Sequence, residues 1–336
     1  MNILLTGGTG YIGSHTALVL SELGHKAVLL DNLSNSNEII LEKLKQITGS
    51  TFSFVKGDIR DTGLIKQTLN DFDIEIVFHF AGLKSVGESV IDPMDYYSNN
   101  VLGTISLIDG MRAQSIKSLV FSSSATVYGA PKYLPIDELH PTSATNPYGR
   151  TKLHIEEMLQ DLASSDEEWA IASLRYFNPV GAHESGLIGE MPKGIPNNLM
   201  PYIAEVAIGK SKELQVFGDD YATRDGTGVR DYVHVMDVAQ GHAAALDFLK
   251  TNGGFHPINL GTGQGLSVLE IVHSFEAACN IKIPYRVISR RPGDIDACYA
   301  NAQKAVFLLN WKAERTLKEM CESAWKFQQS AVLKKS

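Results

Sequence analysis

The feature that most constrains this chain is a glycine-rich turn near its start, Thr6-Gly7-Gly8-Thr9-Gly10-Tyr11-Ile12-Gly13, which directly follows an apolar run. Glycines at this spacing permit a tight strand-to-helix turn, a close approach of backbone to a pyrophosphate, and tight helix packing. A helical pattern over residues 14–25 comes next, and the free N–H groups at the start of such a helix favour an anion. The order of strand, turn and helix predicts a dinucleotide site.

The end of the second apolar run, residues 26–32, indicates which dinucleotide binds. Asp31 closes this run and Asn32 follows it, with no arginine in the next few positions. A carboxylate here can accept hydrogen bonds from the ribose hydroxyls of NAD and would repel the extra phosphate of NADP. We therefore expect NAD. Asp58-Ile59, after the third run, could hold the adenine, or Asp58 could be a helix N-cap; both interpretations stay open.

Short apolar runs alternate with helical patterns through the first half of the chain, at residues 2–7, 26–32, 52–58, 74–82, 118–124 and 170–178. Runs that are apolar on both faces and separated by helices are typical of buried parallel strands. This predicts an α/β fold with a doubly wound parallel sheet, Rossmann-like, over residues 1–178. Glycine and proline become frequent afterwards, which predicts a smaller α+β domain over 179–336. We expect part of about 230–262 to return and pack on the first domain.

Composition excludes several classes of protein. The net charge of −8 and the absence of long basic runs argue against nucleic acid as the main partner. No apolar stretch is long enough to span a bilayer, and the start of the chain does not resemble a signal peptide. The three cysteines lack metal or redox spacing and are expected to be reduced thiols. We expect a cytoplasmic protein without a metal site or a membrane partner.

Tyr148 and Lys152 stand four positions apart, so they share one face if the segment after Asn146-Pro147 is a helix. A phenol titrates near 10, and a cation one turn away favours the phenolate and lowers that pKa. Such a tyrosine can take a proton from an alcohol while hydride leaves the same carbon. Proline at the first position of a helix costs no hydrogen bond, so we expect the helix to begin here.

A hydroxyl cluster ends the run at 118–124, where a doubly wound sheet presents its ligand groups. It comprises Ser122, Ser123, Ser124 and, just beyond, Thr126. A hydroxyl here would orient a substrate and donate to a developing oxyanion. A serine turn and an exposed Tyr/Lys pair are common without function. The order of glycine turn, acidic second strand, hydroxyl cluster and Tyr-x-x-x-Lys favours catalysis.

These motifs, together with HFAGLKSVGES (79–89), NNVLGT (99–104), FSSSATVYG (121–129), LRYFNPVGAH (174–183), GIPNNLMPYI (194–203) and GTGVRDYVHV (226–235), resemble the extended short-chain dehydrogenase/reductase family. Within it the chain is most similar to the UDP-glucose 4-epimerases, over nearly its whole length. The resemblance implies NAD-dependent C4 epimerisation of UDP-hexoses through a transient 4-keto sugar, with the hydride returned to the opposite face. It also implies a homodimer.

The resemblance assigns Tyr148 as base and acid, Lys152 as its modulator and as a contact of the nicotinamide ribose, and Ser124 as the hydroxyl that orients the substrate. The implied NAD contacts, beyond the glycine turn, Asp31, Asn32, Asp58 and Ile59, are Phe80, Ala81, Lys84, Asn99, Ser122, Tyr148, Lys152, Tyr176 and Phe177.

Two arginines in the second half, Arg230 and Arg291, could each pair with the diphosphate of the sugar nucleotide in bidentate fashion. Surface ion pairs with Asp225, Asp231 or Asp294 are the alternative. The resemblance adds further residues to the UDP-sugar pocket: Ser124, Thr126, Asn178, Asn198, Leu199, Val216, Phe217, Asp294 and Cys298.

Cys298 departs from the pattern of members confined to glucose and galactose nucleotides, where a tyrosine four places after the motif's aspartate walls the sugar pocket. Tyr299 follows, but a shift of one residue in an extended segment would point it to the opposite face. The smaller side chain leaves room for an acetamido group, so we expect UDP-GlcNAc and UDP-GalNAc as additional substrates. Alternatively, Cys298 is a small buried apolar residue and only UDP-Glc and UDP-Gal are substrates.

Three other functions on the same fold can be weighed. Related 4,6-dehydratases carry an acidic pair after the hydroxyl, whereas this chain reads Ser124-Ala125-Thr126. A cofactor-binding sensor would lose the Tyr/Lys pair, which is present. Another NAD-dependent nucleotide-sugar dehydrogenase or reductase stays open as the alternative.

Overall fold

The largest element of the computed structural model is a seven-stranded parallel sheet; the structure describes residues 1–192, 196, 198–291 and 293–333. The strand order is β10-β6-β5-β4-β1-β2-β3. The strands are β1 (Asn2–Thr6), β2 (Lys26–Asp31), β3 (Ser53–Lys56), β4 (Ile76–His79), β5 (Ser118–Ser124), β6 (Ala170–Tyr176) and β10 (Gly254–Leu260). The predicted doubly wound α/β class is confirmed. Three residues of GIPNNLMPYI (194, 195 and 197) and residues 292 and 334–336 lie outside the described residues.

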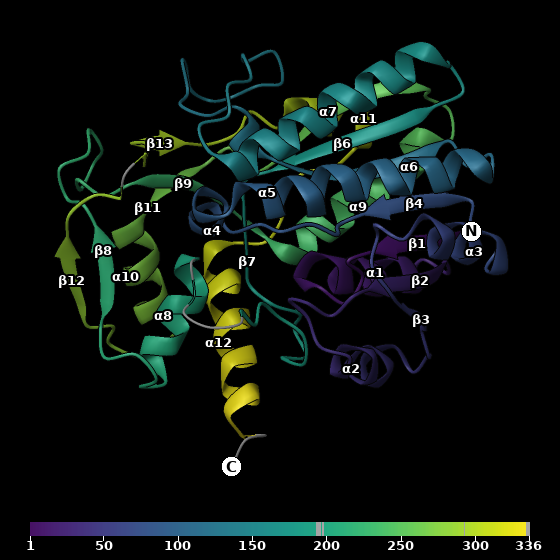
Figure 1. Ribbon diagram of the computed structural model, residues 1–336. Coiled ribbons are helices and arrows are strands. Elements are labelled where there is room, and N and C mark those ends of the chain that lie inside the picture. The colour runs from purple at the N-terminus through teal and green to yellow at the C-terminus, as the bar shows by residue number, and fades with distance from the viewer. Residues whose placement is uncertain (193–195, 197, 292, 334–336) are drawn as a thin grey trace.

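Helices cover both faces of this sheet, because its strands are apolar on both faces (Figure 1). Ile3 and Leu5 of β1 belong to one buried cluster, with α1 (Tyr11–Glu22), α2 (Ile39–Thr48), α9 (Val235–Leu249) and α11 (Gln303–Leu309). Leu4 belongs to a second cluster on the other face, with α3 (Thr62–Asp71), α6 (Gly103–Ala113) and α7 (Pro147–Ser165). The sheet is therefore buried between two helical layers.

A single irregular helical segment leads into α6. It consists of α4 (Val86–Ile91), α5 (Pro93–Tyr96) and the π-helical turn η1 (Tyr97–Leu102).

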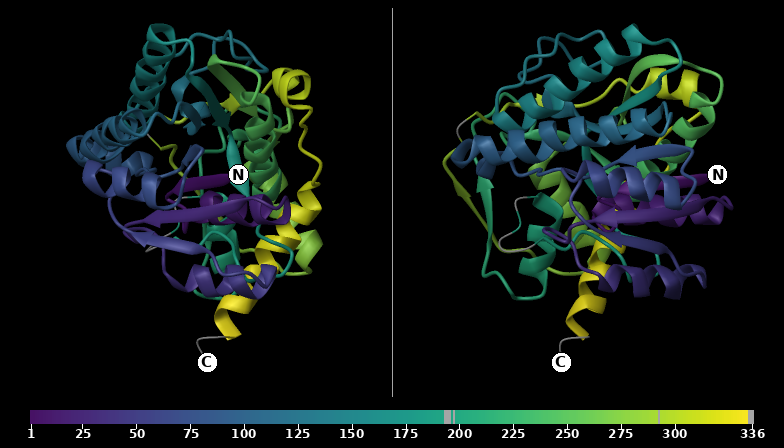
Figure 2. Two further views of the ribbon diagram at one scale, coloured as in Figure 1. Left: turned by 90° about the vertical axis from the view of Figure 1, so that its right-hand side faces the viewer. Right: turned by 45° about the vertical axis from the view of Figure 1, so that its right-hand side comes forward.

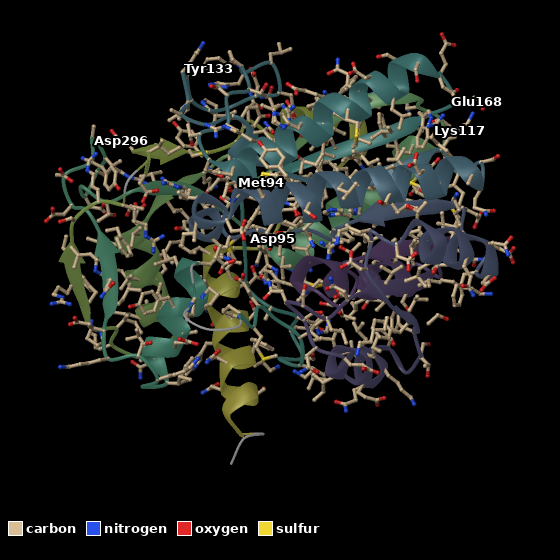
Figure 3. The ribbon with its side chains drawn as sticks, in the orientation of Figure 1. Met94, Asp95, Lys117, Tyr133, Glu168 and Asp296 are labelled. Carbon is tan, nitrogen blue, oxygen red and sulfur yellow. The ribbon has the colours of Figure 1, made fainter. Side chains whose placement is uncertain are left out.

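Figure 3 shows Met94 and Asp95 of α5 on the face turned toward the viewer, while Lys117 and Glu168 lie together at the N-terminal ends of β5 and β6. The latter two form an exposed ion pair. The C-terminal ends of the strands, which carry the hydroxyl cluster, lie away from that pair.

The rest of the chain builds smaller sheets around a third apolar cluster. One sheet contains β7 (Asn178–Val180), β9 (Val229–His234), β11 (Gly265–Ser267) and β13 (Ala297–Cys298). The parallel pair β8 (Leu214–Phe217) and β12 (Tyr285–Ile288) forms one edge of the molecule (Figure 1). The helices here are α8 (Leu199–Ala207), α10 (Val268–Cys279) and α12 (Leu317–Leu333), and α12 ends at the protruding C-terminus (Figure 2).

The chain crosses between the two parts more than once. After β9, helix α9 packs against α1, and β10 then pairs with β6 at the edge of the large sheet. Residues 235–260 are thus structurally part of the large sheet and its covering layer, although they lie among segments of the smaller part. Within the described ranges no helix is long and apolar enough to cross a membrane.

Candidate active site

The glycine turn after β1 has no room for side chains. Gly7 has a φ of +66°, and a Cβ there would lie 2.7 Å from the amide nitrogen of Ala81. A Cβ on Gly13 would lie 2.4 Å from the carbonyl oxygen of Gly7. Helix α1 starts at Tyr11 behind Gly10, without a side-chain cap on its first N–H groups. Bare backbone at a helix start fits the pyrophosphate of a dinucleotide.

Asp31 stands at the C-terminal end of β2, beside this turn. Its carboxylate accepts hydrogen bonds from the Thr9 amide at 3.2 Å, the Leu33 amide at 2.8 Å and the Ser36 hydroxyl at 2.9 Å. These bonds hold the acidic group next to the glycine turn, where the sequence predicted a ribose contact. That contact stays a prediction.

Asp58 is not the N-cap of the helix that follows it, which was one of its two predicted roles. The N-cap of α3 is Asp61, whose carboxylate accepts from the Leu64 amide at 3.0 Å. The N-cap interpretation of Asp58 is therefore wrong. Its carboxylate instead binds the Arg60 side chain, with Nη2 at 2.8 Å, and the Asn32 amide at 3.1 Å. The bonds from Arg60 lower the Asp58 pKa well below its usual value. Ile59, the next residue, is buried against α6.

Helix α7 begins where the sequence predicted. Asn146 is the N-cap, its side-chain oxygen accepting from the Gly149 amide at 2.9 Å, and Pro147 is the first helical residue. Tyr148 and Lys152 are both buried on the face directed at β5. The Lys152 Nζ donates to the carbonyl oxygen of Ser122 at 2.6 Å. The predicted pair therefore meets the predicted hydroxyl cluster.

The surroundings of Tyr148 in the structure change the pKa of its phenol in opposite directions. Burial raises it above the ordinary value, and a hydrogen bond with Ser124 and the positive charge of Lys84 offset this only in part. Burial also lowers the pKa of Lys152 to about 8. The Lys152 amine is directed at the Ser122 carbonyl, and the role of Lys152 as the modulator of Tyr148 stays a prediction.

A buried ion pair behind the catalytic candidates was missed from the sequence. Glu156, one turn beyond Lys152 on α7, accepts from Arg175 Nε of β6 at 3.0 Å. It also accepts from the hydroxyls of Ser123 at 2.6 Å and Ser173 at 2.8 Å. The network ties α7 to both strands next to it. The i, i+4 spacing of Lys152 and Glu156 on a buried face was the available signal.

Asn100 is a second residue that the sequence did not single out, although its neighbour Asn99 is a predicted NAD contact. Its side-chain oxygen accepts from the Leu83 amide at 2.8 Å, and its nitrogen donates to the Leu83 carbonyl and the Thr151 hydroxyl, both at 3.0 Å. This locks the loop that holds the predicted contacts Phe80, Ala81 and Lys84 against α7. Asn99 is half-buried in η1.

The end of β6 brings three further candidates to the same edge of the sheet. The hydroxyls of Tyr176 and Ser122 share a hydrogen bond. Phe177 is buried beside Val127 and Cys298 in a small apolar cluster. Asn178 opens β7, paired with Tyr232 of β9. Residues distant in sequence, from β5, β6 and β13, thus line one region.

The two candidate arginines make different kinds of contact: Arg230 forms an ion pair, and Arg291 lies over an aromatic ring. Arg230 Nη2 binds Asp294 Oδ1 at 3.0 Å, and its Nη1 donates to the carbonyls of Val229 and Ile295. Arg291 lies over the ring of Phe217 at 3.8 Å. Of the three aspartates considered as partners, Asp294 is the one bonded to Arg230. This orients the guanidinium group without consuming all five of its donors.

The remaining candidates for the UDP-sugar pocket differ in burial and in their partners. Val216 is buried, Leu199 is half-buried at the start of α8, and Asn198 Nδ2 donates to Glu190 Oε1 at 2.7 Å. Thr126 donates to the Ser124 hydroxyl at 3.0 Å.

Cys298 and Tyr299 face opposite ways. Cys298 is buried among Val127, Phe177 and Ala300, and burial raises its thiol pKa to about 11. Tyr299 lies beside Gly265 of β11, where a Cβ would be 2.9 Å from its ring. The alternation of an extended segment explains this, so Tyr299 does not replace a tyrosine at 298. Among the described residues, no group of three or more His, Cys, Asp or Glu side chains could hold a metal ion.

Known proteins match this chain along its length. Residues 4–324 match the family described as GDP-mannose 4,6 dehydratase. A UDP-glucose 4-epimerase of Bacillus subtilis is 54% identical over 99% of this chain and 98% of its own. The chain belongs to the UDP-glucose 4-epimerase family. The predicted resemblance, which is to that family within the extended short-chain dehydrogenases/reductases, is confirmed.

Solved structures agree with membership of the UDP-glucose 4-epimerase family. One from Stenotrophomonas maltophila, with bound NAD and formylated UDP-arabinopyranose, has 50% identity and a TM-score of 0.98, covering 99% of each chain. A UDP-Glc/GlcNAc 4-epimerase of Campylobacter jejuni has 35% identity and a TM-score of 0.85, covering 98% of this chain and 99% of its own. The fold is common to all of them.

Proposed function

We propose that this chain is an NAD-dependent UDP-hexose 4-epimerase, with Tyr148 as the acid–base group. The observation that carries the proposal is the buried side chain of Tyr148 on α7, which lies beside Ser124 at the C-terminal end of β5. Family membership supports the same activity. A site for a reacting alcohol carbon must place a proton acceptor and a hydroxyl donor together, and this pair provides both.

The residues present fit NAD. The side-chain-free turn at Gly7 and Gly13 admits a pyrophosphate, and Asp31 stands where a ribose would lie. When bound, NAD supplies a hydride acceptor that can also return the hydride. We assign the cofactor contacts to the residues named from the sequence, with Ser122, Tyr176 and Phe177 at the nicotinamide end.

Tyr148 then has two tasks on the sugar. It takes the proton of the 4-hydroxyl as the 4-keto sugar forms, and gives it back when the alcohol is restored. Ser124 orients the C4 oxygen through its hydroxyl. Lys152, buried with a pKa of about 8, helps hold the ribose, and the positive charge of Lys84 favours the phenolate of Tyr148.

The UDP end is assigned to the second part of the chain, residues 179–336. Arg230 and Arg291 offer guanidinium groups to the diphosphate, and Asp294 holds Arg230 in place. Firm binding of UDP would allow the sugar to rotate within the site, which must accommodate both epimers and the 4-keto form. The division into an NAD part, 1–178, and a UDP-sugar part, with 230–262 returning to the first, belongs to this proposal.

We further propose that UDP-GlcNAc and UDP-GalNAc are substrates. Cys298 is small and buried in the cluster that holds Phe177, and Tyr299 points away from it. The Campylobacter jejuni protein with the same fold carries GlcNAc in its name.

The test uses purified protein without added cofactor, incubated separately with UDP-Gal and UDP-GlcNAc, followed by separation of the sugar nucleotides. Conversion of both is expected. Cys298→Tyr should abolish turnover of UDP-GlcNAc and spare UDP-Gal, while Cys279→Ala, distant from the cluster, should change neither. If Cys298→Tyr still converts UDP-GlcNAc, the pocket argument is wrong. Failure to convert either, even with NAD added, would favour another dehydrogenase or reductase.

A homodimer is also part of the proposal. Exposed apolar side chains are found on α4, α5 and α6, among them Ile91 at 86% exposure. Met94 of α5, labelled in Figure 3, is 71% exposed. Leu102 and Ile105 continue this surface onto α6. Several exposed large apolar side chains on neighbouring helical segments are the observation that supports an interface here. The cytoplasmic location expected from the sequence stays a prediction.

A further inference from the structure

The hydroxyls at the end of β5 have different partners. Ser122 shares a hydrogen bond with Tyr176, and Ser124 is the one proposed to orient the substrate. Ser123, between them, donates to Oε1 of Glu156 on α7 at 2.6 Å. Ser123 and Glu156 are both buried. The Ser123 hydroxyl is thus bonded within the protein, although it lies next to two residues of the proposed site.

Helix α7 is held against the end of β5 at three points. Gly149 lies so close to this segment that a Cβ on it would be 2.9 Å from the carbonyl oxygen of Thr126. Lys152 Nζ donates to the carbonyl oxygen of Ser122 at 2.6 Å. Glu156, one turn further along α7, provides the third contact through its bond with the neighbouring serine. Positions 149, 152 and 156 are three and four residues apart, so they share one face of the helix.

The backbone couples Ser123 to the groups on either side of it. The peptide group between Ser122 and Ser123 is planar, so its carbonyl moves with the Ser123 backbone. That carbonyl is the acceptor of the Lys152 amine. The following peptide group leads directly to Ser124, where β5 ends. A bond that fixes Ser123 therefore restrains both of its neighbours.

We propose that Ser123 is a positioning residue: by bonding Glu156 it fixes the end of β5 against α7, and so sets where Ser124 stands relative to Tyr148. A reacting carbon must meet the acid–base group and the orienting hydroxyl together, and a misplacement of about 1 Å can lower the rate by about 10²-fold. The inference rests on the proposed function in giving Tyr148 and Ser124 their roles.

Ser173 of β6 offers a matched comparison. Its hydroxyl donates to the same oxygen of Glu156 at 2.8 Å, and it is as fully buried as Ser123. Its neighbours in the chain, Ala172 and Leu174, are buried apolar residues of the core. Loss of either hydroxyl removes one donor from the same carboxylate. A difference between the two variants therefore reflects where the serine stands in the chain.

Ser123→Ala removes the donor and leaves Glu156 paired with Arg175. With NAD supplied and UDP-Gal as substrate, kcat should fall by roughly tenfold while KM stays within about twofold, because the catalytic groups are displaced and the UDP end is not. Ser173→Ala should leave both constants within about twofold of the wild type. Similar midpoints in urea unfolding are expected for the two variants, since each loses one bond to the same oxygen.

A second measurement does not require turnover. Hydrogen exchange of the backbone amides over residues 118–128 is followed by mass spectrometry in the wild type and both variants. Exchange should be about fivefold faster in Ser123→Ala, as expected for the loss of one buried hydrogen bond, and unchanged in Ser173→Ala. If the alanine variant does not fold, Ser123→Cys, which keeps a weak donor, is compared with Ser173→Cys, and a loss confined to the former is expected.

A kcat for Ser123→Ala within about twofold of the wild type would overturn the inference, as would an equal loss of kcat in Ser173→Ala. A fall in kcat accompanied by a lower urea midpoint than that of Ser173→Ala would also overturn it, because the role of Ser123 would then be structural. Failure of the proposed function looks different. The wild type would convert no UDP-hexose, and the exchange rates of the two variants would alone decide whether Ser123 positions the end of β5.

Discussion

The two parts of this molecule hold their functional candidates by different means. In the large sheet, Tyr148, Lys152 and Ser124 stand on α7 and β5. The buried Glu156 of α7 joins these elements, because it accepts from Ser123 of β5 and pairs with Arg175 of β6. In the smaller part, Arg230 and Arg291 rest on an ion pair with Asp294 and on the face of Phe217. The first arrangement buries its candidate side chains, whereas the second leaves Arg230 half-buried and Arg291 exposed. We infer that the first part carries out catalysis and that the second part binds the UDP group of the substrate.

Tyr148→Phe is expected to separate catalysis from UDP binding most clearly. It removes the hydroxyl that exchanges the proton, so kcat should fall by about 10²- to 10⁴-fold. Affinity for UDP, measured by calorimetry, should stay within about twofold, because the change lies outside the UDP end. A large loss of UDP affinity would break the division.

The second largest effect is expected from breaking the buried ion pair between Glu156 and Arg175. Arg175→Leu leaves Glu156 buried without its partner and should destabilise the fold by about 3–5 kcal/mol in urea unfolding. The exposed pair of Arg224 and Glu270 in the smaller part, with N–O at 2.7 Å, is the matched comparison. Arg224→Leu should cost less than about 1 kcal/mol. Equal losses would show that the two parts do not differ in how they are held.

Lys152 makes the stability of the large sheet depend on pH. Burial lowers its pKa from 10.5 to about 8. As pH rises above about 8, the folded chain releases this proton while the unfolded chain keeps it, so the free energy of unfolding increases. The gain should approach about 3 kcal/mol near the unfolded pKa. Urea titrations of wild type and Lys152→Met across this window test it; the same slope in both would contradict the burial argument.

The smallest effect is expected for Arg230→Ala. Loss of one guanidinium from the UDP end should weaken UDP binding by about tenfold or more, with kcat little changed. Arg224→Ala, an arginine of the same part that bonds Glu270 and the Gly265 carbonyl, is the control and should bind UDP as the wild type does. If kcat falls as far as affinity does, Arg230 acts on the chemistry as well.

Much of the large sheet could be predicted because its signals are local. Each of the six apolar runs became a strand of the sheet, and the glycine turn and Asn146-Pro147 start α1 and α7 as expected. The strands of the smaller part are as short as Ala297–Cys298, and they form through partners far away in the chain. A two-residue strand has no periodicity of its own, so its existence cannot be found in a window of sequence.

The amino-acid sequence by itself determined the fold class, the family, and which residue types occupy the site, because strand periodicity, turn chemistry and helix starts depend on neighbours in the chain. Only the tertiary structure decided the energetic state of those residues. Burial raises the Tyr148 pKa, and Glu190 accepts hydrogen bonds from Lys84 of one part and Asn198 of the other. Desolvation and charge pairing depend on which groups meet in space, and residues 84, 190 and 198 meet only once the chain is folded.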